Sequence, residues 1–304
     1  MNTIQKEILR LKKEKNAIIL AHNYQVPEIL EIADFVGDSY DLSLRAPETT
    51  ADMIVFCGVE FQAESAKLLN PSKKVLIPSN KAGCFMANKI DAEDLYFFKK
   101  EVEKTYKDVK VVCYINTYAD VKAQSDVCCT SANAVKIVEN IDAETIIFVP
   151  DRNLAAYVQT QTQKKIIPWE KGYCFLHTNL LPEKIQEYRE KHPNAEVLMH
   201  PETPLKLHEC ADFILGTGGM IKHVSTSSCN TFLVATEEHM CGALKLKFPD
   251  KEFIPLMRHC TFMGEITLEN TLEALQKEQF EIIIPENIEE AARKTLEKMI
   301  SLSS

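Results

Sequence analysis

The chain has 304 residues, 45% hydrophobic and 26% charged, which is the composition of a globular protein long enough for two or three domains. The net charge of −9 argues against a nucleic-acid partner, because a phosphate backbone needs a dense face of Lys and Arg. No apolar run approaches the ~20 residues that cross a bilayer, and the charged segment MNTIQKEILRLKKEKN lacks the apolar core of a signal peptide. We therefore expect a soluble, cytoplasmic protein without a membrane partner.

Short apolar runs alternate with helical patterns along the chain, which predicts α/β architecture with parallel sheets covered by helices. The predicted strands are, in chain order, 17–21, 54–58, 74–78, 110–115, 146–150, 165–168, 196–200, 232–236 and 252–255. Helical patterns lie between them, as at 60–70, 152–162 and 238–248.

Three cysteines stand at equivalent places in this pattern. KKVLIPSNKAGC ends at Cys84, KKIIPWEKGYC ends at Cys174, and KEFIPLMRHC ends at Cys260. Each follows a short apolar strand and a proline, and the two intervals between them are nearly equal. Such self-similarity indicates three copies of one structural unit.

The front half of each unit repeats as well. A His or Tyr closes the first strand, an Asp precedes a second short strand, and a hydroxyl residue opens the helical stretch that follows. The three sets are His22, Asp34 and Ser39; Tyr114, Asp126 and Ser131; and His200, Asp212 and Thr217. Parallel α/β sheets bind ligands outside the carboxyl ends of their strands, which is where the first and last member of each set fall.

The repeats predict three similar Rossmann-like α/β/α domains around a pseudo-threefold axis. We expect domains at 1–84, 85–174 and 175–260. The tail, 261–304, should pack back on the first domain, because its predicted strand FEIIIP would otherwise be an unprotected edge.

The chain has ten cysteines, and in a reducing compartment they predict packing or metal ligands rather than disulfides. Cys84, Cys174 and Cys260 occupy equivalent loops, and three converging thiolates with one open coordination position form a catalytic type of metal site. Zinc with a water and an iron–sulfur cluster fit these three residues equally well. The others are expected to be packing residues: Cys57, Cys113, Cys128, Cys129, Cys210, Cys229 and Cys241.

Hydrogen-bonding side chains follow the first strand of every unit. They are His22, Tyr24, Tyr114, Asn116, His200 and Glu202. Glu202 is the best candidate for a general acid or base, since a carboxylate near a metal and two histidines can have its pKa tuned. Ser39, Ser131 and Thr217 either cap their helices or, with free helix amides, bind anions.

Several of these phrases together resemble one enzyme family, the quinolinate synthases. They are ILAHNYQVPE, IADFVGDS, TSANAV, PDRNL, HPE, GTGGM and the three lone cysteines. The resemblance runs from about Leu20 to Leu275. It implies three stacked Rossmann-like domains around one [4Fe–4S] cluster. It also implies a condensing, dehydrating reaction of iminoaspartate with dihydroxyacetone phosphate to quinolinate, phosphate and water, in NAD biosynthesis.

Carried over residue by residue, the resemblance places the cluster on Cys84, Cys174 and Cys260, with an open iron acting as a Lewis acid. Substrate-binding positions fall on His22, Ser39, Tyr114, Asn116, Ser131, His200, Glu202 and Thr217. Catalytic roles are expected for Glu202, His22, Tyr24 and His200. Functional coupling to the enzyme that makes iminoaspartate is a further expectation.

Two positions depart from the family pattern: Gly216 stands where Ser is frequent, and Gly264 where Lys is usual. Two other function classes compete with this interpretation. One is a non-catalytic binding or redox-sensing protein that carries the same cluster, and the other is a zinc-dependent, aldolase-like lyase.

Overall fold

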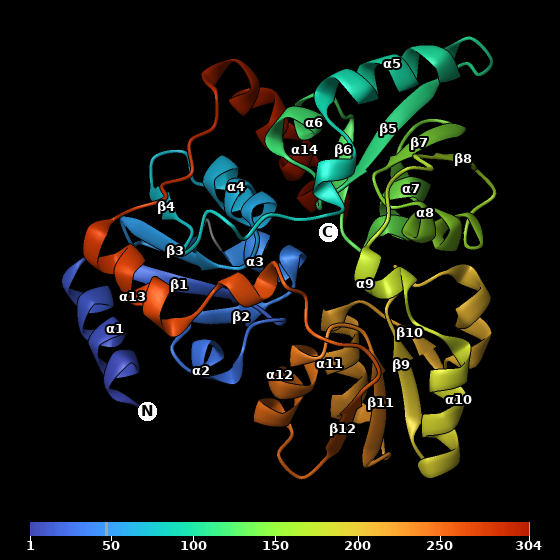
Figure 1. Cartoon of the computed structure of the whole chain (residues 1–304). Helices are drawn as coiled ribbons and strands as arrows, with labels where there is room; N and C mark the ends of the chain where they lie inside the picture. The colour runs from blue at the N-terminus through green and yellow to red at the C-terminus, as the bar shows by residue number, and fades with distance from the viewer. Residues whose placement is uncertain (46–47, 304) are drawn as a thin grey trace.

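The computed structural model describes residues 1–45 and 48–303, and their strands form three four-stranded parallel sheets (Figure 1). The strand orders are β2-β1-β3-β4, β6-β5-β7-β8 and β10-β9-β11-β12, so all three sheets share one topology. The bounds are β1 Ala17–His22, β2 Phe35–Gly37, β3 Met53–Cys57, β4 Lys74–Leu76, β5 Val109–Tyr114, β6 Val127–Cys129, β7 Thr145–Val149, β8 Lys165–Pro168, β9 Glu196–Met199, β10 Phe213–Ile214, β11 Thr231–Ala235 and β12 Glu252–Pro255. The prediction of three similar α/β/α units is confirmed.

Helices flank each sheet, and the three units surround a common centre (Figure 1). The helices of the first unit are α1 Thr3–Glu14, α2 Pro27–Leu30, α3 Ser39–Arg45 and α4 Glu60–Leu69. The second has η2 Ala87–Lys89, α5 Ala92–Glu103, α6 Ala119–Ala123, α7 Ala134–Asn140 and α8 Arg152–Gln159. The third has α9 Phe175–Thr178, α10 Pro182–Lys191, η3 Leu205–Cys210, α11 Thr217–Thr226 and α12 His239–Lys247. After it come η4 Met263–Glu265, α13 Leu268–Lys277 and α14 Glu286–Ser303.

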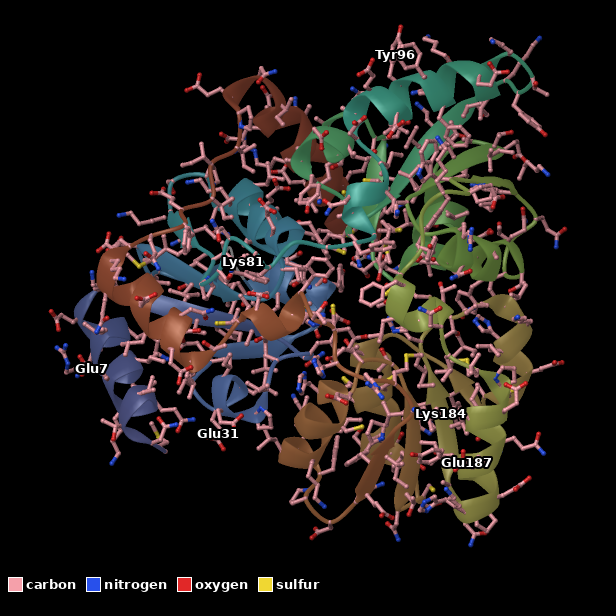
Figure 2. All side chains as sticks on the ribbon, in the orientation of Figure 1. Glu7, Glu31, Lys81, Tyr96, Lys184 and Glu187 are labelled. Atoms are coloured by element: carbon pink, nitrogen blue, oxygen red, sulfur yellow. The ribbon has the colours of Figure 1, made fainter. Side chains whose placement is uncertain are left out.

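The central strands are apolar on both faces, as parallel strands covered on both sides require. Every residue of β3 and of β7 is buried. Polar and aromatic side chains such as Glu187 on α10 and Tyr96 on α5 stand out from the ribbon instead (Figure 2). Burial of the repeated β-branched runs is therefore what brings the three sheets to the same topology.

The repeated aspartate joins the first two strands of each sheet. Its carboxylate accepts the backbone N–H of one residue in the first strand, and its own backbone N–H donates to the carbonyl of that strand residue. The carboxylate distances are 2.7 Å for Asp34 to Ile19, 2.8 Å for Asp126 to Val111 and 2.7 Å for Asp212 to Val197. This side chain extends the ladder beyond the short edge strand and fixes where the cavity-facing loop begins.

The tail divides between two units. Helix α13 packs on α1 and β3 of the first, as expected. Helix α14 differs from the expectation, because it lies mainly against α6 and β6 of the second unit and also touches α4. Its buried face, with Ala292, Leu296 and Met299, is long enough to close the seam between the two units.

The prediction that FEIIIP forms a strand is wrong. It forms a single antiparallel bridge, Glu281 to Leu76, with backbone hydrogen bonds from Ile77 to Phe280 and from Ile282 to Val75. The segment still covers the edge of β4, which was the reason for predicting it. The domain limits at 84, 174 and 260 stay a prediction. No helix in the described part of the chain is both long and apolar enough to cross a membrane.

Candidate functional site

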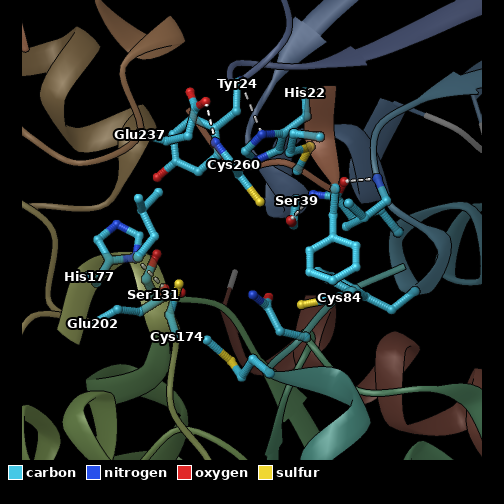
Figure 3. A pocket seen from close by; sticks show the side chains of 18 of the residues that line it. His22, Tyr24, Ser39, Cys84, Ser131, Cys174, His177, Glu202, Glu237 and Cys260 are labelled. Atoms are coloured by element: carbon cyan, nitrogen blue, oxygen red, sulfur yellow. Dashed lines mark hydrogen bonds and ion pairs between the residues drawn. The ribbon is translucent and has the colours of Figure 1, made fainter. Parts of the chain in front are cut away.

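The carboxyl ends of β1, β5 and β9 open on one cavity of about 790 Å³ between the three units (Figure 3). All the residues selected from the sequence line it: His22, Tyr24, Ser39, Cys84, Tyr114, Asn116, Ser131, Cys174, His200, Glu202, Thr217 and Cys260. The structure therefore brings them together, while the role of each one stays a prediction.

Each of the three cysteines is followed by a turn whose backbone N–H groups lower the pKa of the thiol. The donors are Met86 and Ala87 for Cys84, His177 for Cys174, and Phe262 and Met263 for Cys260. Burial raises the pKa of Cys84 to about 12 and also raises the pKa of Cys174 and of Cys260, while these amides oppose the rise. A metal that displaces the thiol protons gains the amide hydrogen bonds, since they strengthen on a thiolate.

Two buried carboxylates hold the cysteine backbone. Asp151 accepts the N–H of Cys174 at 3.1 Å, and Glu237 accepts the N–H of Cys260 at 2.9 Å. Asp151 also caps α8 by accepting from Leu154 at 2.7 Å. Both acids are 0% exposed, so they fix two of the three cysteine loops from within the protein.

A chain of polar contacts crosses the cavity wall and joins all three units. The Tyr114 hydroxyl donates to Oε1 of Glu202 at 2.6 Å, and Nδ1 of His177 lies 2.9 Å from Oε2. Nε2 of His177 lies 2.8 Å from Oγ1 of Thr236, which lies 2.5 Å from the hydroxyl of Tyr24. These contacts hold Glu202, His177, Thr236 and Tyr24 next to one another along the cavity wall.

Glu202 is ionised at neutral pH. Burial opposes ionisation, but His177 and the hydrogen bond from the Tyr114 hydroxyl outweigh it and hold the pKa of Glu202 at about 2. The side chain is 4% exposed, so bulk water does little to screen it. A buried carboxylate of this kind can accept a proton from a bound substrate.

His22 and His200 are held in the same way. The backbone N–H two residues on donates to each ring Nδ1, from Tyr24 at 3.2 Å and from Glu202 at 3.3 Å. Burial lowers the pKa of His22 to about 4 and that of His200 to about 3. Both rings are thus neutral, and because Nδ1 accepts, Nε2 carries the proton as a hydrogen-bond donor.

The three hydroxyl residues do not cap their helices. Asp38 accepts the first free amides of α3, from Tyr40 and Asp41 at 2.9 Å each, while Asn133 and Gly216 are the N-caps of α7 and α11. Ser39, Ser131 and Thr217 line the cavity instead, where Oγ of Ser39 accepts from the Gln62 amide at 2.9 Å and Oγ1 of Thr217 accepts from the Asn23 amide at 3.0 Å. Of their two predicted roles, anion binding is the one their placement favours.

Gly216 and Gly264, which depart from the family pattern, differ in the space around them. A Cβ at Gly216 would come within 2.8 Å of Oγ of Ser131, so glycine lets α11 approach this hydroxyl closely. Gly264 lies in the turn after Cys260, where a Cβ would meet the His259 ring at 3.8 Å. A side chain has room at Gly264 but not at Gly216.

Four cavity residues were not predicted, His177, Glu237, Asp38 and Gln62, and neither was the buried Thr236 behind the cavity wall. A signal existed for Glu237, because it stands as far before Cys260 as Asp151 stands before Cys174. His177 follows Cys174 by three residues, a spacing with no counterpart after Cys84 or Cys260. It was missed because the search for repeats selects what the three units share.

A second group of metal-ligand atoms adjoins the cysteines. One ligand atom each from Cys174, His177 and Glu202 lie within 4.8 Å of one another. Sulfur, nitrogen and oxygen donors so placed suit zinc. The cavity thus offers a three-sulfur site and a mixed site that share Cys174.

Comparisons with known proteins identify the family. The family model described as Quinolinate synthetase A protein matches residues 6–301. The quinolinate synthase of Methanothermobacter thermautotrophicus is 47% identical over 307 residues, covering 100% of this chain and 99% of the relative. Those of Alkaliphilus metalliredigens, at 48% with 97% of each chain covered, and Pyrococcus horikoshii, at 46% with 98% of each covered, are similar along their whole length. The chain belongs to the quinolinate synthetase A protein family.

Proposed function

We propose that this protein condenses iminoaspartate with dihydroxyacetone phosphate to quinolinate, releasing phosphate and water, in the cytoplasmic synthesis of NAD. Membership of the family supports this function. The observation that carries it is the cavity itself, where three equivalent cysteine turns face a buried carboxylate and two neutral histidines. A docking protein without catalysis would not need these groups around a concave site.

We propose one [4Fe–4S] cluster held by Cys84, Cys174 and Cys260. The backbone N–H groups directed at each sulfur support this assignment, because iron–sulfur clusters are tuned by such hydrogen bonds. The cluster would supply an open iron that acts as a Lewis acid on a substrate hydroxyl or carboxylate.

The side chains around this site have separable roles in the proposal. Glu202 accepts a proton from the substrate carbon or nitrogen, and the Tyr114 hydroxyl steadies the carboxylate. His22 and His200 donate Nε2–H to developing negative charge on substrate oxygen. Tyr24 exchanges protons through Thr236 and His177.

Anionic ends of the substrates are assigned to neutral donors. The Asn116 amide and the hydroxyls of Ser39, Ser131 and Thr217 line the cavity and suit phosphate and carboxylates. Hydrogen bonds to charged groups are worth about 1.5–3 kcal/mol each. The net charge of −9 is screened beyond ~8 Å at physiological salt, so these local donors dominate. Iminoaspartate would come from a functionally coupled enzyme.

Anaerobic purification followed by metal analysis and an assay of quinolinate formation tests the proposal. We expect a brown protein with four irons per chain that forms quinolinate from the two substrates. A colourless protein that contains zinc and catalyses an aldolase-like cleavage would contradict the proposed cluster. The metal would then be assigned to the mixed site of Cys174, His177 and Glu202. An intact cluster without quinolinate formation would favour a redox-sensing protein.

A further inference from the structure

Lys122 is wholly buried, which is rare for a lysine and calls for a reason. It lies in α6, outside the cavity lining, and its ammonium donates to the carbonyl of Ile115 at 3.0 Å and to the carbonyl of Thr117. The ring of Phe61, which lines the cavity, has its centroid 5.8 Å from Nζ. The charge is therefore bound to the loop that follows β5.

The two carbonyls lie on either side of Asn116, the cavity residue of that loop. The hydroxyl of Thr117 also donates to the carbonyl of Tyr114 at 3.1 Å, which tightens the same turn. An ammonium with two carbonyl partners restricts the backbone on both sides of Asn116. The side-chain amide of Asn116 is thereby held in one position relative to the end of β5.

The third unit repeats this arrangement with a different residue. His208 occupies the place of Lys122, counted from the equivalent residues His200 and Tyr114, and Thr203 occupies the place of Thr117. Nε2 of His208 lies 3.1 Å from the carbonyl of Thr203, and the Thr203 hydroxyl donates to the carbonyl of His200 at 2.8 Å. The cavity residue that this turn presents is Glu202.

The first unit holds the turn after its first strand in a different way. Leu30 stands at the equivalent place, is buried in the apolar core and offers no donor, although the turn closes with a backbone bond from Gln25 to His22 at 3.0 Å, as the third unit's does from Thr203 to His200 at 3.1 Å. Its cavity residue, Tyr24, is anchored through its own hydroxyl on Thr236. A side-chain hydrogen-bond donor eight residues after the repeated His or Tyr is thus specific to the two units that present Asn116 and Glu202.

We propose that Lys122 and His208 are positioning residues that hold Asn116 and Glu202 in the geometry that binds substrate. The inference rests on the proposed function, because it treats these two loops as substrate-binding loops. Neither residue touches the cavity contents. Each acts through the backbone carbonyls of its loop.

Hydrogen–deuterium exchange tests the loop contacts independently of activity. In Lys122→Met, exchange of the 115–118 amides should rise about tenfold, because the opening free energy of that turn falls. Lys164→Met is the matched control, since Lys164 also donates to two carbonyls of the same unit, those of Glu139 and Ile141, at the opposite end of the sheet. Equal exchange in both variants would overturn the proposal, as would wild-type exchange in Lys122→Met.

A double-mutant cycle tests the link to binding, with quinolinate as the calorimetric probe. Asn116→Ala and Lys122→Met should each weaken binding about tenfold, and the double variant should be no weaker than either, because both remove one interaction. Additive losses would overturn the proposal. If Lys122→Met does not fold, Lys122→Gln, which keeps one amide donor, should show intermediate exchange and binding. A wild-type chain that binds no quinolinate would count against the proposed function, and exchange would still decide the positioning role.

His208 provides an independent pair of variants. His208→Gln keeps a donor that can reach the Thr203 carbonyl, whereas His208→Leu does not. We expect His208→Leu to speed exchange of the Glu202 and Thr203 amides about tenfold and to lower kcat more than it raises KM, because Glu202 is the group displaced. His208→Gln should restore both. Failure of the glutamine variant to restore either would contradict a positioning role.

Discussion

The hydroxyl of Tyr114 donates to a carboxylate oxygen of Glu202 at 2.6 Å and so ties the second unit to the third inside the cavity. Tyr114→Phe removes this donor and leaves the carboxylate with less stabilisation. We expect kcat for quinolinate formation to fall on the order of 10²-fold and the free energy of unfolding to fall by about 1–3 kcal/mol. Steady-state kinetics and denaturant titration measure the two effects. Tyr96→Phe, at a ring that is 49% exposed, should change neither, and normal turnover in Tyr114→Phe would exclude this role.

The cysteine assignment predicts a sharp division among the ten thiols. Serine at Cys84, Cys174 or Cys260 should abolish iron and sulfide binding, because each removes one of three ligands. Cys57→Ser is the control, since Cys57 is buried in β3 away from the cavity lining. Iron and sulfide analysis of anaerobically reconstituted protein checks this. Full iron content in any of the three ligand variants would refute the assignment.

Thr236 connects Tyr24 with His177, and Thr236→Val removes the hydroxyl with little change of shape. We expect kcat to fall about tenfold with KM little changed, because the variant interrupts the polar chain and keeps the cavity wall intact. Thr145→Val, at a buried threonine of β7, is the matched control and should leave kinetics unaltered. A variant in which KM rises and kcat holds would mean that Thr236 only shapes the cavity.

The sequence predicted that the site residues lie together because repeated units place equivalent residues at equivalent points of the fold. Equivalent positions in similar units lie at equivalent sheet edges, so His22, Tyr114 and His200 were placed together without any long-range contact being known. The same logic could not find His177, which breaks the repeat. Its contact with Glu202 depends on how α9 packs against the loop after β9 within the third unit, which local periodicity does not record.

The tail shows a second limit of the sequence. FEIIIP has the composition of a strand, but flanking helices hold it so that one bridge to Leu76 forms. Helix α14 has an apolar face that fits any helical neighbour, and its docking on α6 depends on shape complementarity that the pattern does not contain. Element type was therefore predictable where burial dictated it, and partner choice was not.

Acid should destabilise the fold through its buried histidines. An ordinary histidine has a pKa near 6.5, while that of His22 is about 4 and that of His200 about 3 in the folded chain. Between these values the unfolded chain binds protons that the folded chain does not, so stability is present above pH 6.5 and is lost as the pH falls. At pH 5.5 each histidine should cost about 1.4 kcal/mol of unfolding free energy.

Denaturant titrations at pH 7.5 and pH 5.5 measure this loss, and His22→Gln isolates one histidine, because glutamine does not titrate. We expect the variant to lose about 1.4 kcal/mol less than the wild-type chain on acidification. His192→Gln, at the end of α10 and outside the cavity lining, is the control and should keep the wild-type pH dependence. An equal loss in His22→Gln and the wild-type chain would show that His22 can take up a proton without unfolding, and its assignment as a neutral Nε2–H donor would then fail.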